Sequence, residues 1–218
     1  MIIVPSILSD SLEVVQTQID RVFTETNLRR VQIDIVDPEY AEEITIHPID
    51  LLEVNLRDVL VDFHLMTNDP INDVIECSQI KGAHTLIAQI EHMPDQKAFF
   101  EHVESLELHV GLSLDMYTPV EELNTTILNK LSIIQVMGNK AGQQGEPFVS
   151  SMAIPKIKQL VDIRQNTQSS FLIAVDIGMT PENAAICSAA GADMVTPGSF
   201  LWSSENLQSA VEAFSKTL

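Results

Sequence analysis

Two aspartates lie within or at the end of apolar, strand-like runs, where a charged side chain is unusual. Asp34 lies within V-Q-I-D-I-V-D, the β-branched run 31–37, and Asp176 follows a second apolar run in V-D-I-G, 175–178. Side chains alternate between the two faces of a strand, so Gln32 and Asp34 point the same way. Burying such polar side chains is costly unless they have partners or a purpose. Both aspartates are therefore candidates for chemistry.

Two carboxylates that face each other across a pocket suit proton transfer at carbon. One removes a proton next to a carbonyl and the other returns a proton on the opposite face, which inverts that carbon. The enediolate formed between the two steps needs positive charge beside it, which a metal held by carboxylates and an imidazole would supply. We predict Asp34 and Asp176 as the catalytic pair, and Asp34, His64 and Asp176 as metal ligands.

Each of these residues taken alone has a simpler explanation. An aspartate at a strand end often caps the next helix, and a histidine near a core is usually hydrogen-bonded there. For Asp37 we prefer that explanation, because D-P-E reads as a turn leaving the strand. The other three residues, taken together, favour a site.

The elements that would position these residues alternate along the chain. Short β-branched runs predict strands, and amphipathic stretches between them predict helices. The predicted strands are 2–5, 31–36, 59–66, 85–90, 109–114, 133–137, 172–175 and 194–196; the predicted helices are 12–23, 49–54, 71–80, 95–103, 120–130, 152–166, 182–190 and 205–215. Eight such units predict an α/β fold, a single (β/α)₈ TIM barrel forming one domain over 1–218, with an open doubly wound sheet as the alternative.

Two glycine-bearing loops would lie at the same end of such a barrel as the aspartates. G-Q-Q-G, 142–145, follows the sixth predicted strand, and P-G-S, 197–199, follows the eighth. Barrels of this type commonly hold phosphate there with exposed backbone amides. A pair of glycines alone is more often simply a turn.

Composition limits the class of partner. The 218 residues include 12 Lys and Arg against 31 Asp and Glu, a net charge of −19, which argues against nucleic acid and anionic membrane surfaces. Apolar runs are too short to span a membrane, and the N-terminal segment has no basic leader. Cys77 and Cys187 show no metal-binding or redox spacing, so we expect buried thiols in a cytoplasmic protein.

The ordered set of motifs resembles the ribulose-phosphate 3-epimerases. The matching segments are P-S-I-L-S at 5–9, D-I-V-D at 34–37, H-L-M at 64–66, V-M at 136–137, V-D-I-G at 175–178 and G-S at 198–199. Members of that family are (β/α)₈ barrels that interconvert ribulose 5-phosphate and xylulose 5-phosphate. The resemblance implies a small phosphorylated ketose as substrate, one divalent metal (Zn, Fe or Mn) and frequent assembly into homo-oligomers.

The resemblance also implies roles for individual residues. Asp34 and Asp176 would be both the acid–base pair and metal ligands, with His64 as a further ligand near the substrate. Ser6 would contact the sugar, and Met66 and Met137 would line the reaction centre, although filling the core is an equally good role for them. The phosphate would lie along Gly142, Gln143, Gln144, Gly145, Gly178, Gly198 and Ser199, held mainly by backbone amides.

Several positions depart from the family pattern. Gln32 stands where the family has a histidine ligand, and an amide oxygen binds zinc or iron more weakly than an imidazole does, so Gln32 is a doubtful ligand that would suit Mn²⁺ or Mg²⁺ better. Gln89 replaces another histidine, Ile177 replaces a glycine that lets phosphate approach, and Gln143-Gln144 replace the middle of the family's G-F-G-G. The loop 37–40 also differs.

Three functions remain open at this stage. The first is a working epimerase acting at C3 of a ketopentose 5-phosphate, which explains the retained aspartates. The second is a catalytically weakened relative that binds a sugar phosphate or a partner protein, which explains Gln32 and the crowded loops. A barrel lyase related to hexulose-phosphate synthases ranks below both, because D-F-H-L-M-T at 62–67 lacks the lysine and second aspartate of D-x-K-x-x-D.

Overall fold

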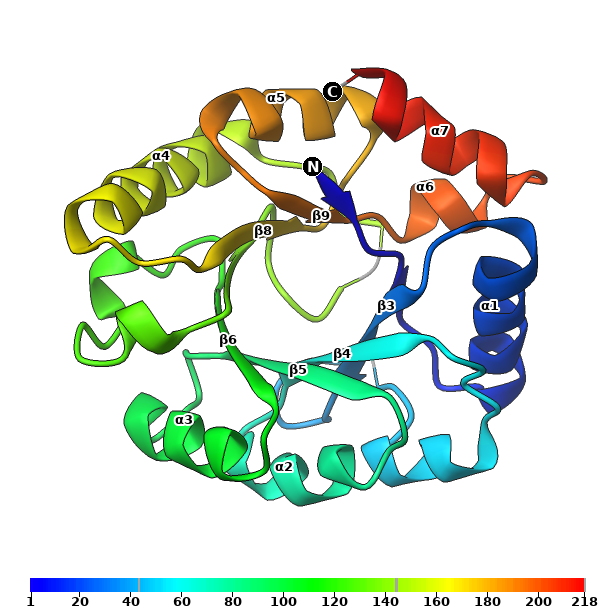
Figure 1. Cartoon of the computed structure of the whole chain (residues 1–218), viewed down its shortest axis with the longest axis horizontal. Helices are drawn as coiled ribbons and strands as arrows, with labels where there is room; N and C mark the ends of the chain where they lie inside the picture. The colour runs from blue at the N-terminus through cyan, green and yellow to red at the C-terminus, as the bar shows by residue number, and fades with distance from the viewer. Residues whose placement is uncertain (43, 144, 218) are drawn as a thin grey trace.

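Parallel strands form a ring with helices around its outside (Figure 1). The computed structural model describes residues 1–42, 44–143 and 145–217. Within these ranges the strands run in the order β1-β9-β8-β7-β6-β5-β4-β3-β2. Their bounds are β1 Ile2–Ile3, β2 Ser6–Ile7, β3 Arg30–Val36, β4 Leu60–Met66, β5 Ala83–Gln89, β6 His109–Leu114, β7 Ile133–Met137, β8 Leu172–Asp176 and β9 Met194–Thr196. The predicted (β/α)₈ barrel is confirmed.

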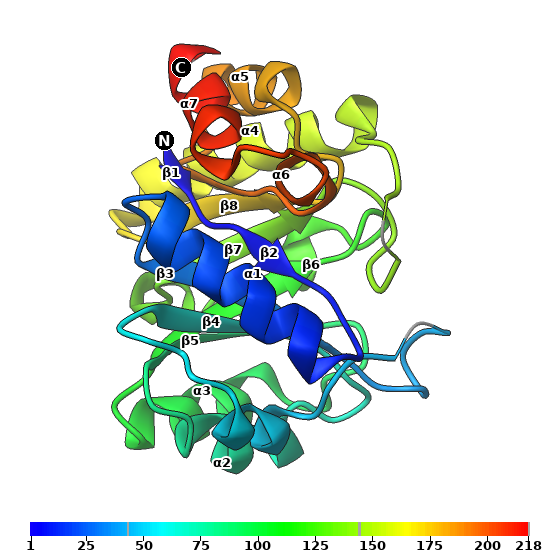
Figure 2. The ribbon, with the colours of Figure 1, turned by 90° about the vertical axis from the view of Figure 1, so that its right-hand side faces the viewer.

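The helices lie against the outer face of this ring, and Figure 2 shows α1 crossing it from the side. Their bounds are α1 Leu12–Glu25, α2 Ile71–Ser78, α3 Gln96–Ser105, α4 Ser150–Thr167, α5 Pro181–Ala190, α6 Ser199–Trp202 and α7 Leu207–Thr217. The start of α5 is capped by Thr180, whose hydroxyl accepts the N–H of Asn183 before a proline at the first helical position. None of the described helices has the length and apolar composition that crossing a membrane requires.

Two of the predicted helices are of the 3₁₀ type, and one of these is divided into two short turns. The segment predicted at 49–54 is the 3₁₀-helix η1, Pro48–Glu53, and the segment predicted at 120–130 is two 3₁₀ turns, η2 Val120–Glu122 and η3 Leu128–Lys130. Between these turns the side chain of Asn124 accepts both the N–H and the hydroxyl of Thr126. A local bond of this kind competes with helical bonding, so the apolar periodicity of the segment does not produce an α-helix.

The first strand closes the ring in two halves. The N–H groups of Ile2, Val4 and Ser6 donate to backbone carbonyls along the β9 side at 2.7, 3.0 and 3.1 Å. Pro5 has no N–H to donate, but its carbonyl accepts the N–H of Gln32 at 2.8 Å on the other side. The proline therefore divides one strand into β1 and β2 without opening the barrel.

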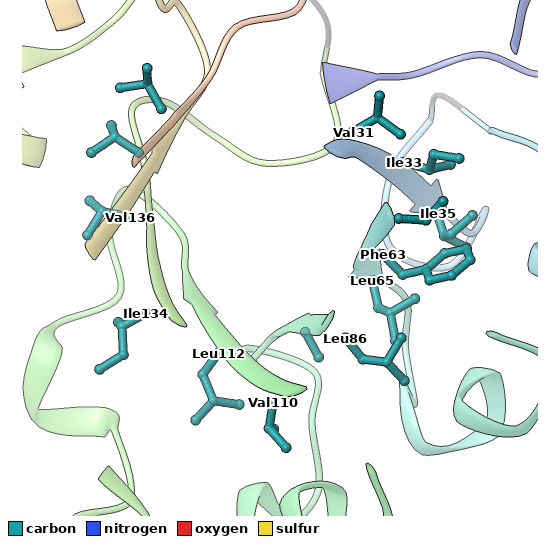
Figure 3. Close-up of a cluster of buried hydrophobic side chains, with 14 of the residues drawn as sticks. Val31, Ile33, Ile35, Phe63, Leu65, Leu86, Val110, Leu112, Ile134 and Val136 are labelled. Carbon is teal, nitrogen blue, oxygen red and sulfur yellow. The ribbon is translucent and has the colours of Figure 1, made fainter. Parts of the chain in front are cut away.

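The main core lies between the strands and the helices. In Figure 3 the labelled side chains Val31, Ile33 and Ile35 point away from the centre of the ring, and so does Phe63. All four are buried, and burying a side chain of this size stabilises the fold by about 1.5–3 kcal/mol. Period-two alternation then turns Gln32, between Val31 and Ile33, toward the barrel interior.

An ion pair lies near the amino ends of the strands, at the opposite end of the barrel from the predicted site. The fully buried carboxylate of Asp62 accepts from Arg30 Nε at 2.7 Å and lies 3.2 Å from His84 Nδ1. A buried carboxylate is tolerated because these partners compensate for its lost hydration. This contact explains Asp62 without a catalytic role.

We predict that Arg30→Met lowers the free energy of unfolding by about 3 kcal/mol, because Asp62 stays buried without its cationic partner. Denaturant-induced unfolding measures the change. The exposed pair Arg57–Asp20 is the matched control, and Arg57→Met should cost less than about 1 kcal/mol. The double variant Arg30→Met/Asp62→Leu should recover most of the loss; if it is no more stable than Arg30→Met, the unpaired charge is not the cause.

Candidate active site

A pocket opens at the carboxyl ends of the strands and collects most of the residues predicted from the sequence. The predicted residues that line it are Ser6, Asp34, Met66, Met137, Gly142, Gln143, Gly145, Asp176, Gly178, Gly198 and Ser199. Leu8, Ile177, Met179 and Thr196 complete the lining. His64 and Gln32 do not line the pocket and are fully buried. Gln144, also predicted, lies outside the described residues.

Three strands bring the two aspartates and His64 together. Asp34 on β3 and His64 on β4 are register partners, and Asp176 ends β8. His64 Nδ1 lies 3.2 Å from Asp34 Oδ1 and 3.5 Å from Asp176 Oδ2. One ligand atom from each residue falls within 4.8 Å of the others, a grouping that could hold a metal ion. All three residues are buried.

The side-chain amide of Gln32 lies at the centre of this group. Its Nε2 donates to Asp34 Oδ1 and to Asp176 Oδ2, both at 2.8 Å, and lies 3.5 Å from His64 Nδ1. Its Oε1 is buried and has no hydrogen-bond partner among the described residues. The nitrogen of the amide, and not its oxygen, therefore faces the carboxylates.

Each aspartate also has a partner of its own. Ser6 Oγ donates to Asp34 Oδ2 at 2.6 Å, and the backbone N–H of Ile177 donates to Asp176 Oδ1 at 2.7 Å. Gln135 Nε2 approaches Asp176 Oδ2 at 3.4 Å. Gln135 was not predicted from the sequence, although it precedes Met137 by two residues on β7 and therefore shares its face.

The two carboxyls differ in pKa. Burial raises the pKa of Asp34, and the negative charge of Asp176 raises it further against the opposing hydrogen bond from His64. Burial alone would raise the pKa of Asp176 too, but its hydrogen bond to His64, the charge of that imidazole and the Gln32 amide together lower it. A proton shared by the pair therefore favours Asp34.

Gln89 lies beside the second ring nitrogen of His64. Burial alone would lower the pKa of His64, but hydrogen bonds to Asp176 and Asp34 and their charges raise it to about 9. A protonated ring donates from both nitrogens, and Gln89 Nε2 lies 3.1 Å from His64 Nε2. Gln89 Oε1 has no partner within the described chain, so turning this amide would give the protonated ring its acceptor.

The donor atoms around this centre fit a divalent cation. Asp34, His64 and Asp176 supply two carboxylates and an imidazole, and the unpaired Gln32 Oε1 supplies a fourth atom once that amide turns. Three oxygens and one nitrogen suit a harder ion such as Mn²⁺ better than they suit Zn²⁺, which prefers sites with softer ligands. The structure therefore brings together Asp34, His64 and Asp176, the group predicted to bind a metal.

The loops beyond the aspartates are closely packed. Gly178 has φ +68°, and a Cβ there would lie 2.4 Å from the backbone nitrogen of Phe148, so this position requires glycine. Ile177 also adopts a positive φ of 69°, which is strained for a β-branched residue, and it packs against the buried cluster of Val36, Met66, Met137 and Ala141. The isoleucine thus lines the predicted phosphate region despite a backbone conformation that favours glycine.

Known proteins resemble this chain over nearly its whole length. Residues 2–202 match the sequence model of the Ribulose-phosphate 3 epimerase family. A ribulose-phosphate 3-epimerase of Bacillus subtilis is 26% identical over 211 residues, covering 96% of this chain and 95% of the relative.

Solved structures resemble the fold at lower identity. KGPDC from Streptococcus mutans in complex with D-R5P superposes with a TM-score of 0.67 at 13% identity, covering 99% of this chain and 95% of that one. A 3-hexulose-6-phosphate synthase from Salmonella typhimurium gives a TM-score of 0.63 at 13% identity, over 100% and 98% of the two chains. These two likenesses show a shared fold.

We predict that Ile177→Gly changes the free energy of unfolding by less than about 1 kcal/mol, because relief of the positive-φ strain offsets the lost packing and the more flexible unfolded chain. The same variant should bind inorganic phosphate several-fold more tightly, as measured by calorimetry. Ile177→Val is the control, since it keeps the branched side chain and should match the wild type. Equal phosphate affinity in Ile177→Gly and the wild type would show that this side chain does not crowd the phosphate.

Proposed function

Because the chain belongs to the ribulose-phosphate 3-epimerase family, we propose that it epimerises C3 of a ketopentose 5-phosphate with Asp34 and Asp176 as the acid–base pair. The observation that carries this proposal is the placement of these two carboxylates. They come from β3 and β8, line one pocket and accept hydrogen bonds from a single amide between them. Such an arrangement puts a proton acceptor and a proton donor beside one substrate carbon.

In the reaction, the carboxylate of one aspartate removes the C3 proton and the carboxylic acid of the other delivers a proton to the opposite face. The pair holds one proton before the reaction, two while the enediolate is present, and one again after the second transfer, so the two residues have exchanged protonation states and act in opposite roles in the reverse direction. The different hydrogen-bond environments of Asp34 and Asp176 support this division of labour, since Ser6 Oγ contacts one and the Ile177 N–H the other.

The negative charge that develops on the enediolate oxygens needs donors close by. His64 and Gln32 direct N–H groups into this centre, and Gln135 adds a weaker one. A divalent cation held by Asp34, His64 and Asp176 would take the place of the His64 and Gln32 N–H groups and supply positive charge beside those oxygens. Met66 and Met137 line the pocket with apolar surface, which limits the access of water to the intermediate.

The phosphate of the substrate would lie along the glycine-bearing loops. Gly142, Gly145, Gly178 and Gly198 line the pocket together with Ser199, and no lysine or arginine is among the described lining residues. Backbone N–H groups and the Ser199 hydroxyl would therefore hold the phosphate, in keeping with a chain of net charge −19.

A second candidate is a weakened relative that binds a sugar phosphate and turns it over slowly. Two observations favour it: the Gln32 amide nitrogen bridges the carboxylates where a cation would bind, and Ile177 lines the pocket beside the loops predicted to hold phosphate. Both candidates use the same pocket and ligand class. They differ in turnover, so an exchange measurement separates them.

We predict that the wild type catalyses wash-in of solvent deuterium at C3 of ribulose 5-phosphate, and that Asp176→Asn slows this exchange by roughly 100-fold or more. NMR of the sugar in D₂O, with Zn²⁺, Fe²⁺ or Mn²⁺ added in turn, measures it. The asparagine keeps the shape of the side chain but cannot take up the proton.

The control for this measurement is Asp162→Asn, which changes an exposed carboxylate on α4 and should leave the exchange rate unchanged. Circular dichroism spectra of both variants should match the wild type. Absence of exchange in the wild type with every metal would favour the weakened relative, and full exchange in Asp176→Asn would remove Asp176 from the mechanism.

A further inference from the structure

The Gln32 amide nitrogen contacts every member of the metal-binding group. It lies 2.8 Å from a carboxylate oxygen of Asp34 and of Asp176, and 3.5 Å from His64 Nδ1. A cation bound by these three residues would occupy the same region. The amide hydrogens thus perform one task of a cation, which is to hold two carboxylates close together against their repulsion.

An amide nitrogen cannot itself bind a metal, because it presents hydrogens and no available lone pair. The atom that could bind one is Gln32 Oε1, which is buried and has no hydrogen-bond partner among the residues described. The last torsion of a glutamine is broad and roughly two-fold, so a half turn exchanges the two ends of the amide. After that turn the unpaired oxygen faces the carboxylates, an arrangement that is favourable only with a cation between them.

We propose that the side-chain amide of Gln32 has two orientations. In one orientation it assembles the site without a metal, and in the other it makes the site selective for hard cations. In the position seen, its N–H groups bridge Asp34 and Asp176. In the turned position, Oε1 becomes a ligand beside Asp34, His64 and Asp176. The inference rests on the proposed function only in taking those three residues as the metal ligands.

Two consequences follow from the exchange of positions. Binding a cation must first break two charge-assisted hydrogen bonds, so the affinity for any divalent ion is lowered. The fourth ligand is an amide oxygen and not an imidazole. Relative to a site with histidine at this position, the loss of metal affinity is therefore larger for Zn²⁺ than for Mn²⁺. Gln32 therefore sets both the strength and the selectivity of metal binding.

The first test measures thermal stability in chelator and in Mn²⁺. The wild-type melting temperature should differ little between EDTA and MnCl₂. Gln32→Met has a similar size but no donor, so its melting temperature in EDTA should fall by roughly 5 °C and MnCl₂ should restore most of the loss. Gln135→Met is the matched control, since Gln135 Nε2 reaches one of the two carboxylates, Asp176 at 3.4 Å, and otherwise contacts Met137 Sδ, so the melting temperature of this variant should not become metal-dependent.

The second test measures metal binding by calorimetry. Gln32→His should bind Zn²⁺ at least about tenfold more tightly than the wild type, with a smaller gain for Mn²⁺. The proposal would be overturned if the melting temperature of Gln32→Met in EDTA equalled that of the wild type. Equal zinc affinity in Gln32→His and the wild type would overturn it as well. If Gln32→Met does not fold, the zinc and manganese affinities of Gln32→His still decide. None of these measurements is turnover, so a wild type that fails to exchange the C3 proton would overturn the proposed function and leave this inference intact.

Discussion

Two buried carboxylates held together by one amide form the contact on which the site depends. Asp34 and Asp176 would repel each other if both were ionised in the barrel interior, where little water screens them. The Gln32 amide donates one hydrogen bond to each, and His64 lies within reach of both. The pair is therefore held in place by residues of the barrel itself.

The barrel makes this contact possible by joining segments that are far apart in the sequence. Residues of β3 and β8 meet inside the ring. On β3, Val31, Ile33 and Ile35 pack against the outer layer, so the alternate side chains Gln32 and Asp34 must point inward. At the other end of the interior the Arg30–Asp62 pair neutralises a buried charge without taking part in the site. The polar interior thus has two ends. One is stabilised by an ion pair, and at the other the amide oxygens of Gln32, Gln89 and Gln135 have no hydrogen-bond partner among the described residues.

The parts of this description that depend on local pattern were predictable from the sequence. Period-two alternation predicted that Gln32 and Asp34 share one face of a strand, and the alternation of strands with helices predicted the barrel. The segment 120–130 was not predictable in this way, because its apolar spacing suits a helix while the Asn124 side chain forms a competing turn. The orientation of the Gln32 amide was also beyond the sequence. It depends on Asp176, 144 residues away along the chain, which makes the nitrogen the inward-facing end.

The indole of Trp202, the only tryptophan in the chain, links the strand that closes the barrel to the candidate site. Its Nε1 donates to the backbone oxygen of Ser6 at 2.6 Å, and the hydroxyl of that serine donates to Asp34. Trp202 also ends α6, the short helix that begins at Ser199 in the pocket. Indole fluorescence from this protein therefore has a single source, which is joined through one residue to the Asp34 carboxylate, so the native chain carries an optical probe of its own site without an added label.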